Sequence, residues 1–452
     1  MTRFGRRLGA IHSNHKRIAA GALLIGALTL VAKLFVAARE VAIAWRHGVS
    51  STVDAYQLSL TATTWAPMMI IGVMAVVLVP RLVKLERQGD ERERFIAELN
   101  ASVLIVGMAT AALTWLAAPA VAALLASHMD ARTLGLTATM TAQMAPVALF
   151  MVASGYLFAR LQSRERYGYT VTEALPALAI ALFVIIQPGV AGASALIAGT
   201  VIGYLLQLMV LGALVVRSDP PLGGLRVRHH SNEWESLYGP ILLMVLGQLL
   251  ISASIPIDQG FAARMGEGAV ATLGYANRIV TLFSGLATIV VGRALLPVLS
   301  GAVADGDLAV GRRHALQWSV LLFWAAAVGS SIAWIAAPDL VRLLFQRGAF
   351  TAAASAHVSH LLRYGLLQLP PYFAGIALVQ WYAASSRFRS ILFITAVALV
   401  VKILLNVIFA PVLGVVGIMV STAAMYGVTF CLLAVGMRNY KGRSTSAPLS
   451  LH

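Results

Sequence analysis

Long apolar stretches recur along almost the whole chain, and they restrict its fold more than any other feature. Twelve of them are long enough, at about 20 residues each, to cross a hydrocarbon layer roughly 30 Å thick as helices. They cover approximately residues 18–45, 54–82, 99–125, 134–160, 169–187, 192–217, 236–262, 270–299, 315–337, 356–384, 391–410 and 413–437. Hydrophobic residues make up 59% of the chain and charged residues only 12%, which excludes a water-soluble domain of this length. The sequence therefore predicts an all-α polytopic membrane protein.

The basic residues indicate which helix ends face the cytoplasm. If the N-terminus lies inside, most Lys and Arg residues fall in segments on the cytoplasmic side, as Arg81, Lys84, Arg160 and Arg438 do. Such an excess of positive charge is typical of cytoplasmic loops in inner-membrane proteins. We therefore predict a multi-pass protein of the bacterial cytoplasmic (inner) membrane with both termini inside. The formal net charge of +16 is then explained by topology and contacts with membrane lipids, and no nucleic-acid partner is expected.

Residues that could support enzyme chemistry are few. Cys431 is the only cysteine, which excludes internal disulfides and cysteine-based metal sites. The histidines, including His357 and His360, lack metal-ligand spacing beside acids, and the chain has no phosphate-binding loop for ATP hydrolysis. We expect no enzyme activity, no metal and no cofactor. Membrane potential or an ion gradient is the energy source that we expect for transport.

Two sequence motifs occur twice at nearly the same separation. Residues 78–82 read LVPRL and residues 295–299 read LLPVL, 217 positions later. Residues 115–119 read WLAAP and residues 334–338 read WIAAP, 219 positions later. Two six-helix halves inserted in the same direction must be related by an axis along the membrane normal. The sequence thus predicts two lobes related by a pseudo-two-fold axis with a cavity between them, although a duplicated protein with a tightly closed interface would show the same repeat.

The repeat divides the chain into five predicted parts. The polar segment that contains Pro220, Pro221, Gly223 and Gly224 is the natural linker between the lobes. The parts are a cytoplasmic tail (1–17), an N-lobe of six helices (18–217), a cytoplasmic linker (218–235), a C-lobe of six helices (236–437) and a second cytoplasmic tail (438–452).

Charged residues at membrane depth are costly, so they normally face water or a charged partner and indicate a functional site. Six basic residues qualify as candidates for substrate binding, namely Lys33, Arg39, Arg278, Arg293, Arg363 and Lys402. Four acids at similar depth, Glu40, Asp54, Glu173 and Asp258, are candidates for gating or ion coupling. The cations outnumber the acids by two, and a cavity with that excess of positive charge favours an anionic substrate.

For several of these residues the sequence is compatible with two different arrangements. Lys33 and Glu40 share a face of the first helix, but Arg39 points about 120° away from Lys33 on a regular helix. Either the cavity wraps around this helix, or the helix is bent or unwound there. Lys402 could contact the cavity or form a buried pair with an acid such as Glu173.

The tenth apolar stretch contains the pair Pro370 and Pro371 in mid-span. Each proline removes a backbone donor, so we expect a kink at this point. The kink could be a hinge for alternating access or a static bend.

Three stretches resemble the MurJ/MviN lipid II flippases of the multidrug/oligosaccharidyl-lipid/polysaccharide exporter superfamily. The first runs from Lys33 through Arg39 and Glu40 to the VDAY motif at residues 53–56. The second contains GEG at 266–268, YANR at 275–278 and LLPVLS at 295–300. The third is LFQRGAF at 344–350, similar to a periplasmic loop of that family.

The resemblance implies a transporter that moves an undecaprenyl-pyrophosphate-linked saccharide from the inner to the outer leaflet by alternating access. Arg39 and Arg278 fall on the family's essential cavity arginines, Lys33 on a third basic position, and Asp54 on its functional aspartate. Arginine forks suit paired hydrogen bonds to pyrophosphate, whereas a lysine acts as a point charge. Proteins of cell-envelope glycan assembly are the partners that the resemblance implies.

Some positions differ from the family pattern. The chain has twelve apolar stretches where fourteen are usual, Asn277 where an acid is common beside Arg278, and Lys33 in place of Arg. The basic residue expected in the second helix, near Trp65, is missing. A flippase for an exopolysaccharide or O-antigen unit is therefore an alternative to a lipid II flippase. A multidrug antiporter, which exports cations, fits the cationic excess less well.

Overall fold

The computed structural model describes residues 28–86, 89–126, 128–164, 166–187, 193–219, 223–227, 231, 234–285, 308–385 and 387–438, and these ranges contain helices and no strand. In the first part of the chain the helices are α2 (Ser51–Leu85), α3 (Gly89–Leu125), α4 (Ala131–Met144), α5 (Pro146–Ser163), the 3-10 helix η1 (Tyr167–Ala174), α6 (Leu175–Ile186) and α7 (Ala193–Ser218). They are followed by α8 (Glu235–Ser252), α9 (Ser254–Ala262), η2 (Ala263–Met265), α11 (Leu308–Phe345), α12 (Ala352–Leu366), α13 (Leu369–Ala384), α14 (Phe388–Leu413) and α15 (Val415–Arg438). Residues 28–47 and 269–285 are also helical.

Some features predicted from the sequence lie outside the described residues. They are Arg293, the repeated motif at 295–299, the N-terminal tail at 1–17, residues 439–452 of the C-terminal tail, and the linker residues 220–222, 228–230 and 232–233.

Seven described helices are long and apolar enough to cross a membrane, and the pair α4–α5, bent by 44°, raises the number to eight. These eight coincide with eight of the twelve predicted apolar spans. Two of the other four, 18–45 and 270–299, extend outside the described residues. The remaining two, 236–262 and 356–384, are each interrupted by a helix break. The all-helical membrane architecture is confirmed, and the count of twelve stays a prediction.

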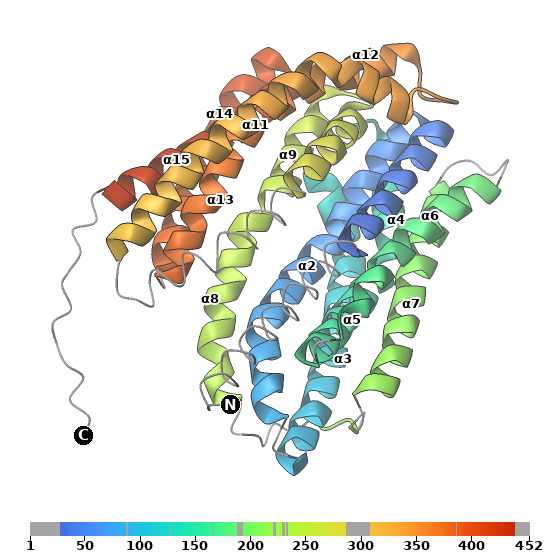
Figure 1. The fold of residues 1–452 in the computed structure, drawn as a ribbon. Coiled ribbons are helices and arrows are strands. Elements are labelled where there is room, and N and C mark those ends of the chain that lie inside the picture. Colours follow the sequence, from blue (N-terminus) through green and yellow to red (C-terminus); the bar gives the residue numbers. More distant parts are fainter. Residues whose placement is uncertain are drawn as a thin grey trace, which may run out of the picture. The chain divides into compact units, whose positions relative to one another are not determined.

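The break in the span 356–384 lies beside the proline pair. α12 ends at Leu366 and α13 begins at Leu369, with Pro370 and Pro371 in its first turn (Figure 1). The first turn of a helix has backbone N–H groups without intrahelical partners, so two prolines cost little there. The helix is interrupted directly before the prolines, whereas the size of the kink and a role in gating stay predictions.

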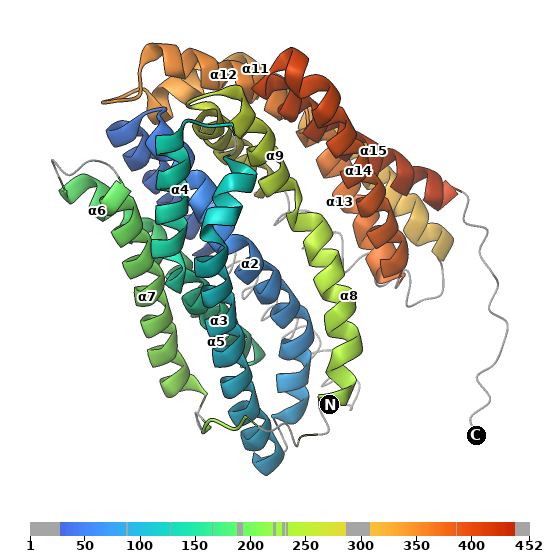
Figure 2. The same cartoon turned by 180° about the vertical axis from the view of Figure 1, so that it is seen from behind.

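The described residues up to 278 form a compact unit together with residues 338–359. Within it α2 packs against α3, α4, α5 and α8, and α5 packs against α7 (Figures 1 and 2). Leu78 and Leu82 of α2, Phe95 of α3 and Val152 of α5 belong to one buried apolar cluster. The burial of these side chains between helices fixes how the helices of this unit pack.

One buried acid joins three helices of the first unit. Asp219, directly after α7, is fully buried and pairs with Arg92 of α3 and Arg160 of α5. Arg164, at the end of α5, bonds both Asp219, at 2.9 Å, and the exposed Glu86. The predicted topology puts these helix ends on the cytoplasmic side, where several arginines thus have a structural role in addition to a topogenic one.

The described residues among 279–337 and 360–438 form a second compact unit. Its described core joins α11, α13, α14 and α15 around Trp381 and Tyr382. The Tyr382 hydroxyl donates to the carbonyl of Leu433 at 3.0 Å, and Ser319 donates to the carbonyl of Ala374 at 3.0 Å. The two units follow packing rather than the sequence repeat, since α8 and α9 belong to the first unit. The predicted division into lobes at 218–235 stays a prediction.

The charge cluster around Asp219 gives a stability prediction. Asp219→Asn leaves Arg92 and Arg160 buried without a counter-charge, which we expect to cost about 3–5 kcal/mol of unfolding free energy. Glu86→Gln is the matched control, because Glu86 is exposed and its pair with Arg164 contributes at most about 1 kcal/mol. Denaturant unfolding of the purified protein in detergent measures both. Equal stabilities of the two variants would contradict the structural role of Asp219.

Candidate functional site

Three of the predicted site residues meet around one carboxylate. Arg39 and Glu40 lie on the helix over residues 28–47, and Arg278 lies on the helix over residues 269–285. The Nε of Arg278 donates to Oε1 of Glu40 at 3.0 Å, and Nη2 of Arg39 donates to the same oxygen. We call Arg39, Glu40 and Arg278 the charged triad.

The triad carries two positive charges and one negative charge. Arg39 and Glu40 are only 7% and 3% exposed, whereas the side chain of Arg278 is 40% exposed. The Nε of Arg39 is buried and has no hydrogen-bond partner among the described residues. Leaving a buried charged donor unsatisfied is costly, so this atom and the surplus charge both favour the approach of an anion.

Aromatic side chains surround Arg39. The hydroxyls of Tyr56 and Tyr204 lie close enough to interact electrostatically with its guanidinium. Tyr56, on α2, also shares a 3.1 Å hydrogen bond with Thr200 of α7. The guanidinium thus lies in the electrostatic field of side chains from two further helices, α2 and α7.

Lys33 occupies a different environment from Arg39. Residues 28–47 form one continuous helix, so the proposed unwinding between Lys33 and Arg39 is not observed. Lys33 is exposed and its charge acts on Glu173, which is also exposed. Glu173 is thus an acid that Lys33 influences electrostatically. On this continuous helix Lys33 shares a face with Glu40, and Arg39 points about 120° away from Lys33.

The other predicted residues are dispersed. Lys402 is fully buried beside Asn406, one turn further along α14, and has an interaction partner. Arg363 donates from Nε to the carbonyl of Trp334 at 3.2 Å, which satisfies part of its guanidinium. Asp258, on α9, is buried and also has a partner. A role for these three residues in binding or coupling stays a prediction.

Asp54 caps a helix other than its own. It lies in the first turn of α2, fully buried, and accepts bonds from the backbone N–H groups of Gly268 at 2.5 Å and Ala271 at 2.6 Å. These N–H groups begin the helix that carries Arg278. In return Glu267 accepts a bond from the backbone N–H of Ser51 at 3.1 Å. Each acid satisfies the free N–H groups and the positive dipole end of the opposite helix.

The loop over residues 345–350 closes onto the same region. The N–H of Ala349 donates to the carbonyl of Trp45 at 2.8 Å, and the Tyr275 hydroxyl donates to the carbonyl of Gly48 at 2.9 Å. Gly348 has a φ of 58°, and a Cβ there would collide with the Trp45 carbonyl. Only glycine therefore allows this close approach. We call residues 45–54, 266–275 and 345–350 the interlock.

Sequence reasoning missed part of this arrangement. Asp54, Gly268 and Gly348 stood out through the family resemblance, but nothing in the sequence indicated that Asp54 and Glu267 cap each other's helices. The only signal was that each acid lies close to a helix start, which is typical of capping. That an acid caps a partner helix more than 200 residues away follows from the fold alone.

The comparisons with known proteins identify the family. The model of the family described as "Lipid II flippase MurJ" matches residues 43–447. This chain belongs to the MurJ family. It is 26% identical to the lipid II flippase MurJ of Burkholderia cenocepacia over 439 residues, covering 92% of this chain and 83% of that protein. It is 25% identical to the probable lipid II flippase MurJ of Rhizobium meliloti, covering 87% of this chain and 76% of that protein.

Solved structures of the same fold include MurJ in an inward closed conformation, with a TM-score of 0.78 at 17% identity over 92% of this chain and 87% of that one. An inward-facing multidrug transporter of the MATE family has a TM-score of 0.76 at 13% identity, covering 91% of this chain and 97% of that chain. At these identities the likeness establishes a MurJ/MATE-like fold. Membership of the MurJ family follows from the sequence matches.

The reciprocal caps of the interlock can be tested by labelling. In a Cys431→Ser background, a cysteine replacing the fully buried Val53 reacts with a thiol reagent only when the interlock opens. Since a cap contributes about 0.5–2 kcal/mol, Asp54→Ala is expected to raise the labelling rate of the purified protein about 2- to 30-fold. Asp130→Ala, which removes the cap of α4 outside the interlock, is the control and should leave the rate unchanged. An unchanged rate in Asp54→Ala would show that the caps do not hold the interlock closed.

Proposed function

We propose that this protein transports a lipid-linked saccharide across the bacterial inner membrane and that the charged triad binds its pyrophosphate. The observation that carries the proposal is the shared Glu40 carboxylate, which holds two guanidiniums together and leaves a surplus of one positive charge. Membership of the MurJ family supports lipid II as the lipid-linked saccharide that is transported.

The charged triad suits a substrate that must be bound and then released. Without cargo, Glu40 offsets the repulsion between the buried Arg39 and the half-exposed Arg278 and keeps both guanidiniums in place. A pyrophosphate offers several oxygens to the free Nε of Arg39 and to the half-exposed Arg278. Because Glu40 competes for the same donors, binding is weaker than it would be to two unpaired arginines, and release becomes easier.

The interlock supports transport by alternating access. It joins segments from the first part of the chain (45–54) to segments after the predicted linker (266–275 and 345–350) through five hydrogen bonds to backbone groups. In the predicted topology it lies at the periplasmic end, so it would close the outer exit while the cytoplasmic side admits substrate. Flexing at Pro370 and Pro371, coupled to membrane potential or an ion gradient, would reverse this state.

Two other functions can be distinguished from this one. A flippase for an exopolysaccharide or O-antigen unit would use the same pyrophosphate and hence the same triad. The glycan that accumulates on its polyprenyl carrier when the protein is depleted distinguishes the two. A multidrug antiporter would require a site for cations, and the surplus positive charge of the triad does not favour one.

Removing either arginine of the triad tests the pyrophosphate assignment. A charge-assisted hydrogen bond contributes about 1.5–3 kcal/mol, so Arg39→Ala and Arg278→Ala should each weaken substrate binding about 10- to 150-fold. Complementation of a depleted strain should be lost while membrane insertion is retained. Arg264→Ala is the control, since Arg264 is exposed and lies over the ring of Phe261. Wild-type growth of both triad variants would reject the assignment.

A further inference from the structure

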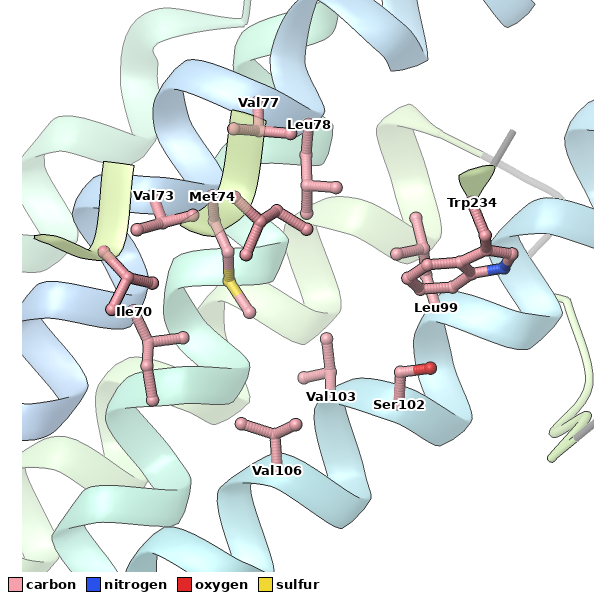
Figure 3. A pocket seen from close by; sticks show the side chains of 12 residues that line it. Ile70, Val73, Met74, Val77, Leu78, Leu99, Ser102, Val103, Val106 and Trp234 are labelled. Carbon is pink, nitrogen blue, oxygen red and sulfur yellow. The ribbon is translucent and has the colours of Figure 1, made fainter. Parts of the chain in front are cut away.

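A groove of about 240 Å³ lies between α2, α3 and α8 in the first compact unit (Figure 3). Ten of its 12 lining residues are aliphatic or methionine, and the others are Ser102 and Trp234. The groove does not include any member of the charged triad or the interlock. The binding and gating described above do not involve the residues of this groove.

The two lining residues with polar atoms have their donors engaged elsewhere. The Ser102 hydroxyl donates to the backbone carbonyl of Glu98 at 2.8 Å, and the Trp234 indole donates to the carboxylate of Glu98 at 2.8 Å. A polar ligand would therefore lose its hydrogen bonds to water on entering the groove and gain few in return. The lining of the groove therefore favours a hydrocarbon chain over a polar ligand.

The groove is elongated along the helices. Its residues on α2 run from Ile70 to Leu78 at helical spacing, a length of about 12 Å at 1.5 Å per residue. The same face of α2 continues with Arg81, one turn beyond Leu78, and then with the exposed Lys84. An apolar track that ends at two cations is complementary to an amphiphile with an anionic head.

We infer that this groove binds the polyprenyl chain of the lipid-linked substrate, with the phosphate at Arg81 and Lys84, before the headgroup reaches the charged triad. The inference rests on the proposed function. A single track fits a lipid with one chain better than a phospholipid with two. Its walls come from helices on both sides of the predicted linker, α2 and α3 before it and α8 after it, all within the first compact unit.

Adjacent residues of α2 provide a matched test of the site. Val77 lines the groove, whereas Val76 is 53% exposed on another face of the same helix. A photoreactive amino acid is placed at either position in the full chain, which is reconstituted in phospholipid nanodiscs with radiolabelled polyprenyl phosphate. We expect cross-linking that is several-fold stronger at position 77 and that saturates with increasing probe. Unlabelled polyprenyl phosphate should compete, and phosphatidylglycerol should not.

Any of three results would overturn the inference. Equal cross-linking at positions 76 and 77 would mean contact with bulk lipid only, and equal competition by phosphatidylglycerol would mean that an ordinary phospholipid fills the groove. Filling the groove with Val77→Phe should abolish saturable binding of the probe, whereas Val76→Phe should retain it. Retained binding in Val77→Phe would also contradict the site.

Transport by the wild-type protein, measured in parallel with a lipid-linked saccharide, separates the two proposals. Wild-type transport without selective cross-linking at position 77 would reject the groove site alone. Selective cross-linking without any wild-type transport would reject the proposed function and leave a polyprenyl-binding groove.

Discussion

The structure depends on how the charges of Arg39, Glu40 and Arg278 compensate one another, because Arg39 and Glu40 are buried away from solvent. A buried arginine without a counter-charge is expensive, and two neighbouring arginines also repel each other. Glu40 reduces both costs, because a single carboxylate oxygen accepts a bond from Arg39 and another from Arg278. The compensation is incomplete by one charge, and this incompleteness makes the triad suitable for an anionic headgroup.

The helix that carries Arg278 is held by acids at two points. Asp54 bonds the backbone at Ala271 and Glu40 bonds the side chain of Arg278, seven residues or about two turns later on the same face. Both acids come from the first 54 residues of the chain. The position of Arg278 in the triad is therefore mechanically linked to the interlock, and opening the interlock would change the geometry of the triad.

Much of this arrangement was predictable from the sequence. Apolar length alone gave the membrane-helical fold, the proline pair gave the break before α13, and the cost of intramembrane charge selected Arg39, Glu40, Asp54 and Arg278. The partners of these residues were not predictable, because pairing across more than 200 residues depends on packing rather than on local pattern. Lys33 illustrates this limit, since the family resemblance grouped it with Arg39 and Arg278, whereas in the structure its charge acts on Glu173.

The charge balance of the triad also restricts the kind of cargo that it can favour. A neutral cargo would leave the Nε of Arg39 without an anionic acceptor and the surplus charge uncompensated, and a cation would increase the repulsion. An anion with several oxygens satisfies both requirements at once, and arginine forks favour a phosphate group in particular. The hydrocarbon-selective groove between α2, α3 and α8 has the opposite character. An amphiphile with a phosphate head and a long apolar chain is the one class of molecule that suits both sites.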